Sequence, residues 1–185
     1  MKKTMWMVIL LVIVRCSMYH LQTPDTVPPG RTSFGIGLTG INIDNTPLAF
    51  PGFWARTGIT NNVDIGVHSW GLGLLGDVKL KIVRFFGIGS GLGFTFVGAS
   101  LIYLQGSLYG AIPLGIIEPY TVIRGHFGGV SFQGKSASGN SGSGVFGLRI
   151  NMAKRMSLYG EIGKWQNNDT NTNSSIFGVG LSIGY

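Results

Sequence analysis

Eight charged side chains fall on the polar positions of segments in which polar and apolar residues alternate. They are Arg56, Asp64, Asp77, Lys79, Glu118, Arg124, Arg149 and Glu161. Because successive side chains of a strand point to opposite faces, these residues would share a face opposite the aliphatic ones. Such a set can line a pore or an active site, or it can form ion pairs that fill a narrow interior. Lys81 falls on the same face, so the basic members number five and the acidic members four, a near balance that favours mutual pairing.

His68 and His126 fall on the same polar positions, and Asp64 and Asp77 are close to His68 in sequence. A hydrolase would need a histidine beside an acid or a serine, near the rim of a cleft. No nucleophile motif accompanies either histidine, and the histidines lack the spacing of metal ligands. Residues 71–76 match GxGxxG by letter, but no helix follows them. We therefore expect no enzyme activity, no cofactor and no metal.

The composition indicates what kind of element carries these residues. The chain has 185 residues, of which 31 are glycine and only 11% are charged. Its apolar residues are spread in alternation, and no run reaches the roughly 18–20 residues of a membrane-spanning helix. A transmembrane barrel is the interpretation that fits best, and a soluble β-sandwich is the alternative. The net charge of +7 is dispersed, which argues against a nucleic-acid partner.

The last ten residues carry the clearest alternation. Apolar side chains occupy every second position, at Phe177, Val179, Leu181, Ile183 and Tyr185. This segment resembles the closing strand of bacterial outer-membrane β-barrels. The resemblance implies an assembly signal at these five positions that the barrel-assembly machinery reads. It also implies the outer membrane as the location and outer-membrane lipid as a partner.

Alternation elsewhere predicts an all-β fold, a closed antiparallel transmembrane β-barrel of about ten strands over residues 31–185, with eight strands as the alternative. The expected strands are 31–41, 53–58, 63–68, 72–82, about 87–96, 101–112, 117–127, 145–152, 156–165 and 176–185. Short turns at 59–62, 83–86, 113–116 and 152–156 would lie on the periplasmic side. The long polar segments 42–52, 128–144 and 166–174 would form the outer loops.

Two further expectations concern large side chains. The glycines between residues 87 and 93 would face inward beside Tyr103 and Tyr109, because a narrow barrel must set large residues against small ones. Aromatic residues near the strand ends would face lipid and fix the depth of the barrel. These are Trp54, Trp70 and Trp165 at the outer end and Phe85, Phe86 and Tyr185 at the inner end.

The N-terminus has the pattern of a targeting segment. Lys2 and Lys3 precede an apolar stretch over residues 5–14, which predicts a signal peptide over residues 1–15. Cys16 then resembles the lipidated cysteine of bacterial lipoproteins, although Arg15 departs from that pattern. The alternative is a free cysteine in a leader that is uncleaved or cut elsewhere. Residues 16–30 are rich in proline and predict a tether outside the core.

These features together predict a non-catalytic structural or interaction barrel in the bacterial outer membrane, with a charge-paired and largely filled lumen. The alternative is a narrow, porin-like channel for small or apolar solutes. An outer-membrane enzyme is the third possibility, and it has the least support in the sequence.

Overall fold

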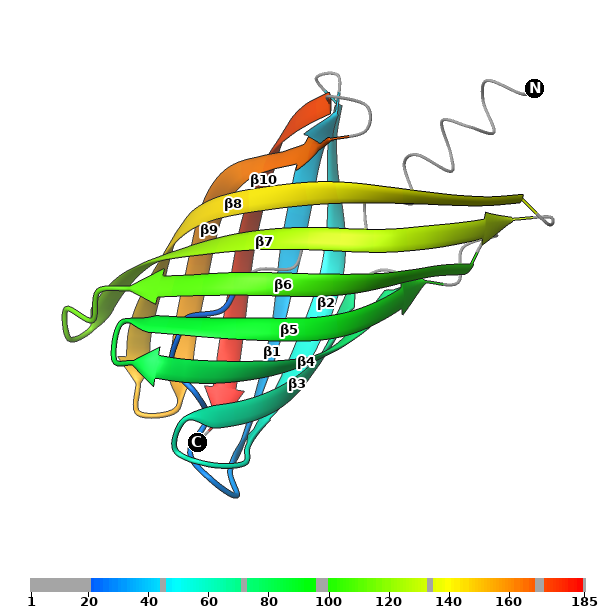
Figure 1. The fold of residues 1–185 in the computed structure, drawn as a ribbon. Coiled ribbons are helices and arrows are strands. Elements are labelled where there is room, and N and C mark those ends of the chain that lie inside the picture. The colour runs from blue at the N-terminus through cyan, green and yellow to red at the C-terminus, as the bar shows by residue number, and fades with distance from the viewer. Residues whose placement is uncertain are drawn as a thin grey trace.

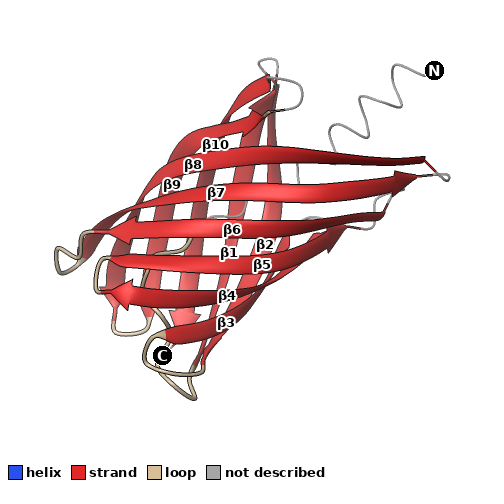
Figure 2. Ribbon diagram, viewed as in Figure 1, coloured by secondary structure: helices blue, strands red, loops and turns tan. Residues whose placement is uncertain are grey.

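The computed structural model describes residues 21–43, 46–70, 73–95, 100–132, 135–168 and 172–184. Within these ranges the chain forms ten strands and no helix (Figures 1 and 2). The strands are β1 (Thr32–Ile43), β2 (Thr46–Gly58), β3 (Val63–Trp70), β4 (Gly73–Val83), β5 (Phe86–Thr95), β6 (Ser100–Ala111), β7 (Ile117–Phe132), β8 (Lys135–Ala153), β9 (Met156–Asn167) and β10 (Thr172–Gly184). None of the described residues belongs to a helix long and apolar enough to cross a membrane.

The strands form one closed barrel in which each strand pairs antiparallel with its neighbours along the chain. β1 closes the sheet on β10, from the pair Ser33–Gly184 to the pair Asn42–Ser175. The predicted closed barrel of ten strands is therefore confirmed, and the eight-stranded alternative is wrong. An even number of strands returns both ends of the sheet to the same side of a membrane.

The exterior of the barrel is apolar on every strand. One side chain from each strand, all at least 45% exposed, illustrates this surface: Phe34, Phe53, Ile65, Val78, Leu92, Leu104, Ile123, Phe146, Ile162 and Val179. Phe177 and Ile183 of the closing strand are exposed in the same way. An apolar band on the outside of a closed sheet is the surface that a barrel presents to lipid.

The connections between strands differ at the two ends of the barrel. At the inner end, by which we mean the periplasmic end, the connections are the short segments 59–62, 84–85, 112–116 and 154–155, as expected. At the outer end, the described residues of segments 42–52 and 128–144 continue the neighbouring strands, where the sequence predicts long loops, and much of 166–174 also belongs to β9 and β10. The hairpin of β7 and β8 projects far beyond its neighbours (Figure 1).

Two prolines within β2 explain why this strand is hard to recognise. Pro47 and Pro51 pair with residues of β1, whereas β2 pairs with β3 only from Gly52 onward. The prolines therefore lie where β2 has a free edge, and a missing N–H is tolerated there.

The aromatic residues do not all lie where the sequence predicts. Phe85 and Phe86 are exposed at the inner end, as expected. Trp54 and Trp165 are instead buried inside the barrel, at 3% and 1% exposure, so their assignment to a lipid-facing belt is wrong. The side chains of Trp70 and Tyr185 are outside the described residues.

Large inward side chains cover bare glycines of the adjacent strand. A Cβ built on Gly93 would come within 2.1 Å of the Tyr103 ring, one on Gly147 within 2.3 Å of the Tyr120 ring, and one on Gly35 within 2.0 Å of the Trp54 ring. Tyr109 covers Gly89 less tightly, at 3.1 Å. The expected opposition of large and small residues is confirmed, and it fills the lumen with side chains.

This packing predicts that Gly147→Ala destabilises the barrel by about 1–3 kcal/mol, because the new methyl overlaps the Tyr120 ring. Gly144→Ala is the matched control on the same strand, since that Cβ would meet nothing within 4 Å. Urea unfolding in detergent micelles measures both variants. Equal stability of the two variants would show that Tyr120 moves aside without cost.

Candidate functional site: the filled lumen

Residues 21–27 lie inside the barrel. Leu21, Gln22, Thr23, Thr26 and Val27 are each at most 6% exposed. The segment enters at the inner rim, where Gly30 donates its N–H to the carbonyl of Gly58 at 3.0 Å. Gly58 permits this passage, because a Cβ there would collide with the carbonyls of Val27 and Pro28. The prediction of a tether outside the core is therefore wrong for residues 21–27, which form a plug; we call them the lumenal segment.

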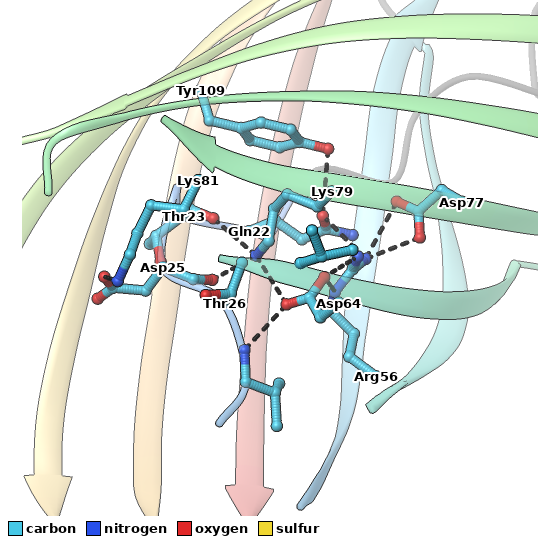
Figure 3. A network of polar contacts seen from close by, with 12 residues as sticks. Gln22, Thr23, Asp25, Thr26, Arg56, Asp64, Asp77, Lys79, Lys81 and Tyr109 are labelled. Carbon is cyan, nitrogen blue, oxygen red and sulfur yellow. Dashed lines mark hydrogen bonds and ion pairs between the residues drawn. The ribbon is translucent and has the colours of Figure 1, made fainter. Parts of the chain in front are cut away.

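Arg56 of β2 is the centre of the polar network (Figure 3). Its Nε donates to Asp64 at 2.9 Å, and its Nη1 donates to both carboxylate oxygens of Asp77 at 2.8 and 3.0 Å. Nη1 also donates to Oε1 of Gln22 at 3.3 Å. All three ionised groups are at most 6% exposed, so each depends on the others for its counter-charge.

Gly66 makes this arrangement possible. Arg56, Gly66 and Asp77 are partners in register across β2, β3 and β4. A Cβ on Gly66 would come within 2.6 Å of the Arg56 guanidinium and 2.7 Å of the Asp77 carboxylate. The bare backbone of β3 thus lets the guanidinium cross one strand and reach an acid on the next.

Lys79 of β4 ties the lumenal segment to this network. Its Nζ donates to the carbonyl of Thr23 at 3.0 Å and lies 3.6 Å from the Asp64 carboxylate. The carbonyl of Asp25 accepts from the same ammonium. Asp64 in turn accepts from the backbone N–H of Val27 at 3.0 Å. Backbone groups of a segment without secondary structure are satisfied by the charges that the barrel wall points inward.

A second cluster lies around Arg149 of β8. Its Nη2 donates to Glu118 of β7, its partner in register, and to Asp25 at 2.9 Å. Its Nη1 donates to the hydroxyl of Thr23 at 2.9 Å. Lys81 lies 3.6 Å from the same Asp25.

Glu161 of β9 holds the other end of the lumenal segment. Its carboxylate accepts from the N–H of Leu21 at 3.0 Å and from the hydroxyl of Tyr120 at 3.1 Å. The side chain of Leu21 rests on the bare glycines 37 and 180, where a Cβ would approach it to 2.7 and 2.6 Å. Glu161 itself fits because Gly178 has no side chain.

The two histidines have different surroundings. His68 belongs to the Arg56 cluster, since it contacts Gln22 at 2.9 Å and Asp77 at 3.3 Å. His126 packs edge-on against Tyr103, with ring centroids 6.1 Å apart, and Arg124 lies over the Tyr109 ring at 5.9 Å. Within the described residues no cluster of acids, histidines and cysteines could hold a metal ion.

The structure places all eight predicted charged residues on the inner face. It brings six of them together in two clusters, one around Arg56 and one around Arg149. The other two, Glu161 and Arg124, interact electrostatically with each other. What the sequence does not indicate is the contribution of Gln22, Thr23 and Asp25. Cys16 lies outside the described residues, and its lipid attachment stays a prediction.

The network predicts a large effect of removing its centre. Arg56→Met leaves two buried carboxylates without their main counter-charge, and we expect a loss of about 3–5 kcal/mol in the free energy of unfolding. Lys164→Met is the control, because Lys164 is an exposed cation on the outside of β9, and its loss is expected to stay within about 0.5 kcal/mol. Urea titration in micelles compares the two; similar small losses would contradict the central role of Arg56.

The fold of this chain is similar to that of several solved β-barrel structures. No protein-family model and no curated protein matches the sequence. The N-terminal β-barrel domain of Pseudomonas aeruginosa OprF is 9% identical with a TM-score of 0.44, over 83% of this chain and 97% of that one. The outer membrane protease OmpT from Escherichia coli is 9% identical with a TM-score of 0.45, over 88% of this chain and 100% of that one. Ail, the attachment invasion locus protein of Yersinia pestis, is 10% identical with a TM-score of 0.39, over 85% and 99%.

These similarities are too low to carry an argument, and the assignment rests on the barrel itself. A closed antiparallel sheet with an even number of strands, short turns at one end and an apolar exterior is the architecture of the bacterial outer membrane. The protein is an outer-membrane β-barrel.

Proposed function

We propose that this barrel is a non-catalytic structural or interaction protein whose lumen is closed by its own lumenal segment. One observation carries the proposal: residues 21–27 bond to side chains from six strands, β2, β3, β4, β6, β8 and β9. A segment held from so many sides fills the lumen in the way that a core fills a soluble domain.

The balance of charge supports a closed lumen. Five inward cations, Arg56, Lys79, Lys81, Arg124 and Arg149, are matched by five acids, Asp25, Asp64, Asp77, Glu118 and Glu161. The fifth acid comes from the lumenal segment. A lining that selects ions would carry an excess of one sign, whereas equal numbers suit ion pairs in a narrow, dry space.

The channel alternative requires the lumenal segment to leave. Gln22 alone contacts Arg56 of β2, His68 of β3 and Tyr109 of β6, and so reaches across the lumen. Solutes would have to pass this level, at which buried side chains already contact one another.

An enzymatic role has little support in the geometry. His68 contacts the amide of Gln22, the guanidinium of Arg56 and the carboxylate of Asp77. Both oxygens of that carboxylate already accept from Arg56, and the lumenal segment covers the group. We therefore propose that His68 is a member of the structural network.

The projecting hairpin is the feature best placed to meet a partner. β7 and β8 extend to residues 132 and 135 and stand beyond the other strands at the outer end (Figure 1). Its paired backbone makes a stiff extension of residues that are mostly glycine, serine and asparagine. We propose this hairpin as the part of the protein that contacts molecules outside the cell.

Conductance tests the closed lumen. In planar bilayers we expect the refolded chain to show no reproducible single-channel current. Replacing residues 21–27 by glycine and serine at the same length removes the side chains that anchor the plug, and we expect stable open levels. The control replaces Pro28 and Pro29 at the inner rim and is expected to stay closed. Heat-modifiable migration on detergent gels verifies that each variant is folded.

A reproducible current through the unaltered chain would contradict the proposal. So would an equally closed state after replacement of residues 21–27, because the charge network alone would then seal the barrel.

The assembly signal is a separate proposal and has its own test. Deleting Tyr185 is expected to lower the amount of assembled barrel in cells and to change refolding in detergent little. One interfacial ring contributes only about 1.5–3 kcal/mol by burial, too little to abolish a closed barrel. Equal losses in cells and in detergent would contradict recognition by the assembly machinery.

A further inference from the structure

Every exposed charged side chain in the described part of the chain is cationic. These residues are Arg31, Arg84, Lys154, Arg155 and Lys164. All but Lys164 lie at the inner end, next to β1 or in the turns after β4 and β8. The described acids face the lumen and are buried or half-buried. The inner rim is therefore a surface of one sign.

A cleft opens in this rim at the seam where the barrel closes. It has a volume of about 400 Å³ and is lined by Arg31, Thr32, Phe34, Arg155, Ile183 and Gly184. Phe34 and Ile183 are partners in register across β1 and β10. The N–H of Gly184 donates to the carbonyl of Arg155 at 2.9 Å, which holds the turn after β8 against the seam.

The cleft is ordered from polar to apolar along the membrane normal. Arg31 precedes β1 and Arg155 lies in a turn, so both are at the aqueous edge. Phe34 and Ile183 lie further along their strands and face outward, at 59% and 56% exposure. Among the described residues, no acid forms an ion pair with either arginine. Two guanidinium groups with no ion pair in the described part of the chain, above an apolar floor, match a phosphate above acyl chains.

We propose that this cleft binds one anionic glycerophospholipid of the inner leaflet, with its phosphate between Arg31 and Arg155 and its acyl chains on Phe34 and Ile183. Net negative charge on the headgroup is required, because a zwitterionic lipid carries its own cation beside the phosphate. An acidic periplasmic protein would meet the arginines but not the floor, which lies on the lipid-facing side of the sheet. The ligand would fasten the seam between β1 and β10 from outside.

Native mass spectrometry of the full chain in detergent tests the site. Phosphatidylglycerol and phosphatidylcholine are titrated in parallel, and we expect one tightly held phosphatidylglycerol and no matching phosphatidylcholine. Arg31→Gln with Arg155→Gln is expected to weaken phosphatidylglycerol binding roughly ten- to thirty-fold, as two surface cations contribute. Arg84→Gln with Lys164→Gln removes the same charge outside the cleft and is expected to stay within about two-fold.

Three outcomes would overturn the proposal. The first is equal binding of the two lipids by the unaltered chain. This measurement does not depend on whether any variant folds. The second is an equal loss in both double variants, which would assign the effect to the overall charge of the protein. The third is equally tight binding of glycerol phosphate, which has no acyl chains and would leave the apolar floor without a role.

Discussion

The pairing of β1 with β10 is the contact on which the rest of the structure depends. A free sheet edge in hydrocarbon would leave its N–H and C=O groups without partners, so only a closed sheet can span the membrane. Closure in this register fixes which face of every strand is inside. A slip of one residue in this pair would set inward side chains of one strand opposite outward side chains of the other, so the two faces of the sheet would no longer match around the barrel. The closing strand also shapes the lumen, because its bare Gly178 and Gly180 leave room for Glu161 and Leu21.

Alternation made the strands and the inward charges predictable, because period two is all that a half-buried strand requires of its sequence. The outer connections were not predictable in the same way. Glycine, asparagine and proline indicate loops in water, yet in residues 46–52 and 128–144 backbone pairing with a neighbouring strand prevails over composition. Trp54 and Trp165 were misplaced although the signal was present. Trp54 lies an even number of residues from Arg56 on the same strand, and Trp165 an even number from Glu161, so each tryptophan shares the inward face of that charge. The alternation of faces along a strand therefore predicts their position better than nearness to a strand end does.

The position of the lumenal segment could not be predicted from the sequence, because residues 21–27 show no hydrophobic periodicity and match no motif. Their role arises only from complementarity with groups that six separate strands bring together. One indirect sign existed in the inward set itself. With Lys81 included, the barrel wall supplies five cations and four acids, and Asp25 completes the balance. The one excess cation of the barrel wall is a reason to look for a further carboxylate elsewhere in the chain.

The depth of Leu21 constrains what a lipid at Cys16 would do. Leu21 is 1% exposed in the lumen, and the chain uses the nine residues from Leu21 to Pro29 to descend from there to the inner rim. Cys16 is only five residues before Leu21, a reach of at most roughly 17 Å. To place a lipid in the inner leaflet, those five residues would have to cover the same depth through a lumen that the Arg56 network already fills. If Cys16 carries the predicted lipid, anchoring in that leaflet and insertion of the lumenal segment therefore compete for the same short length of chain.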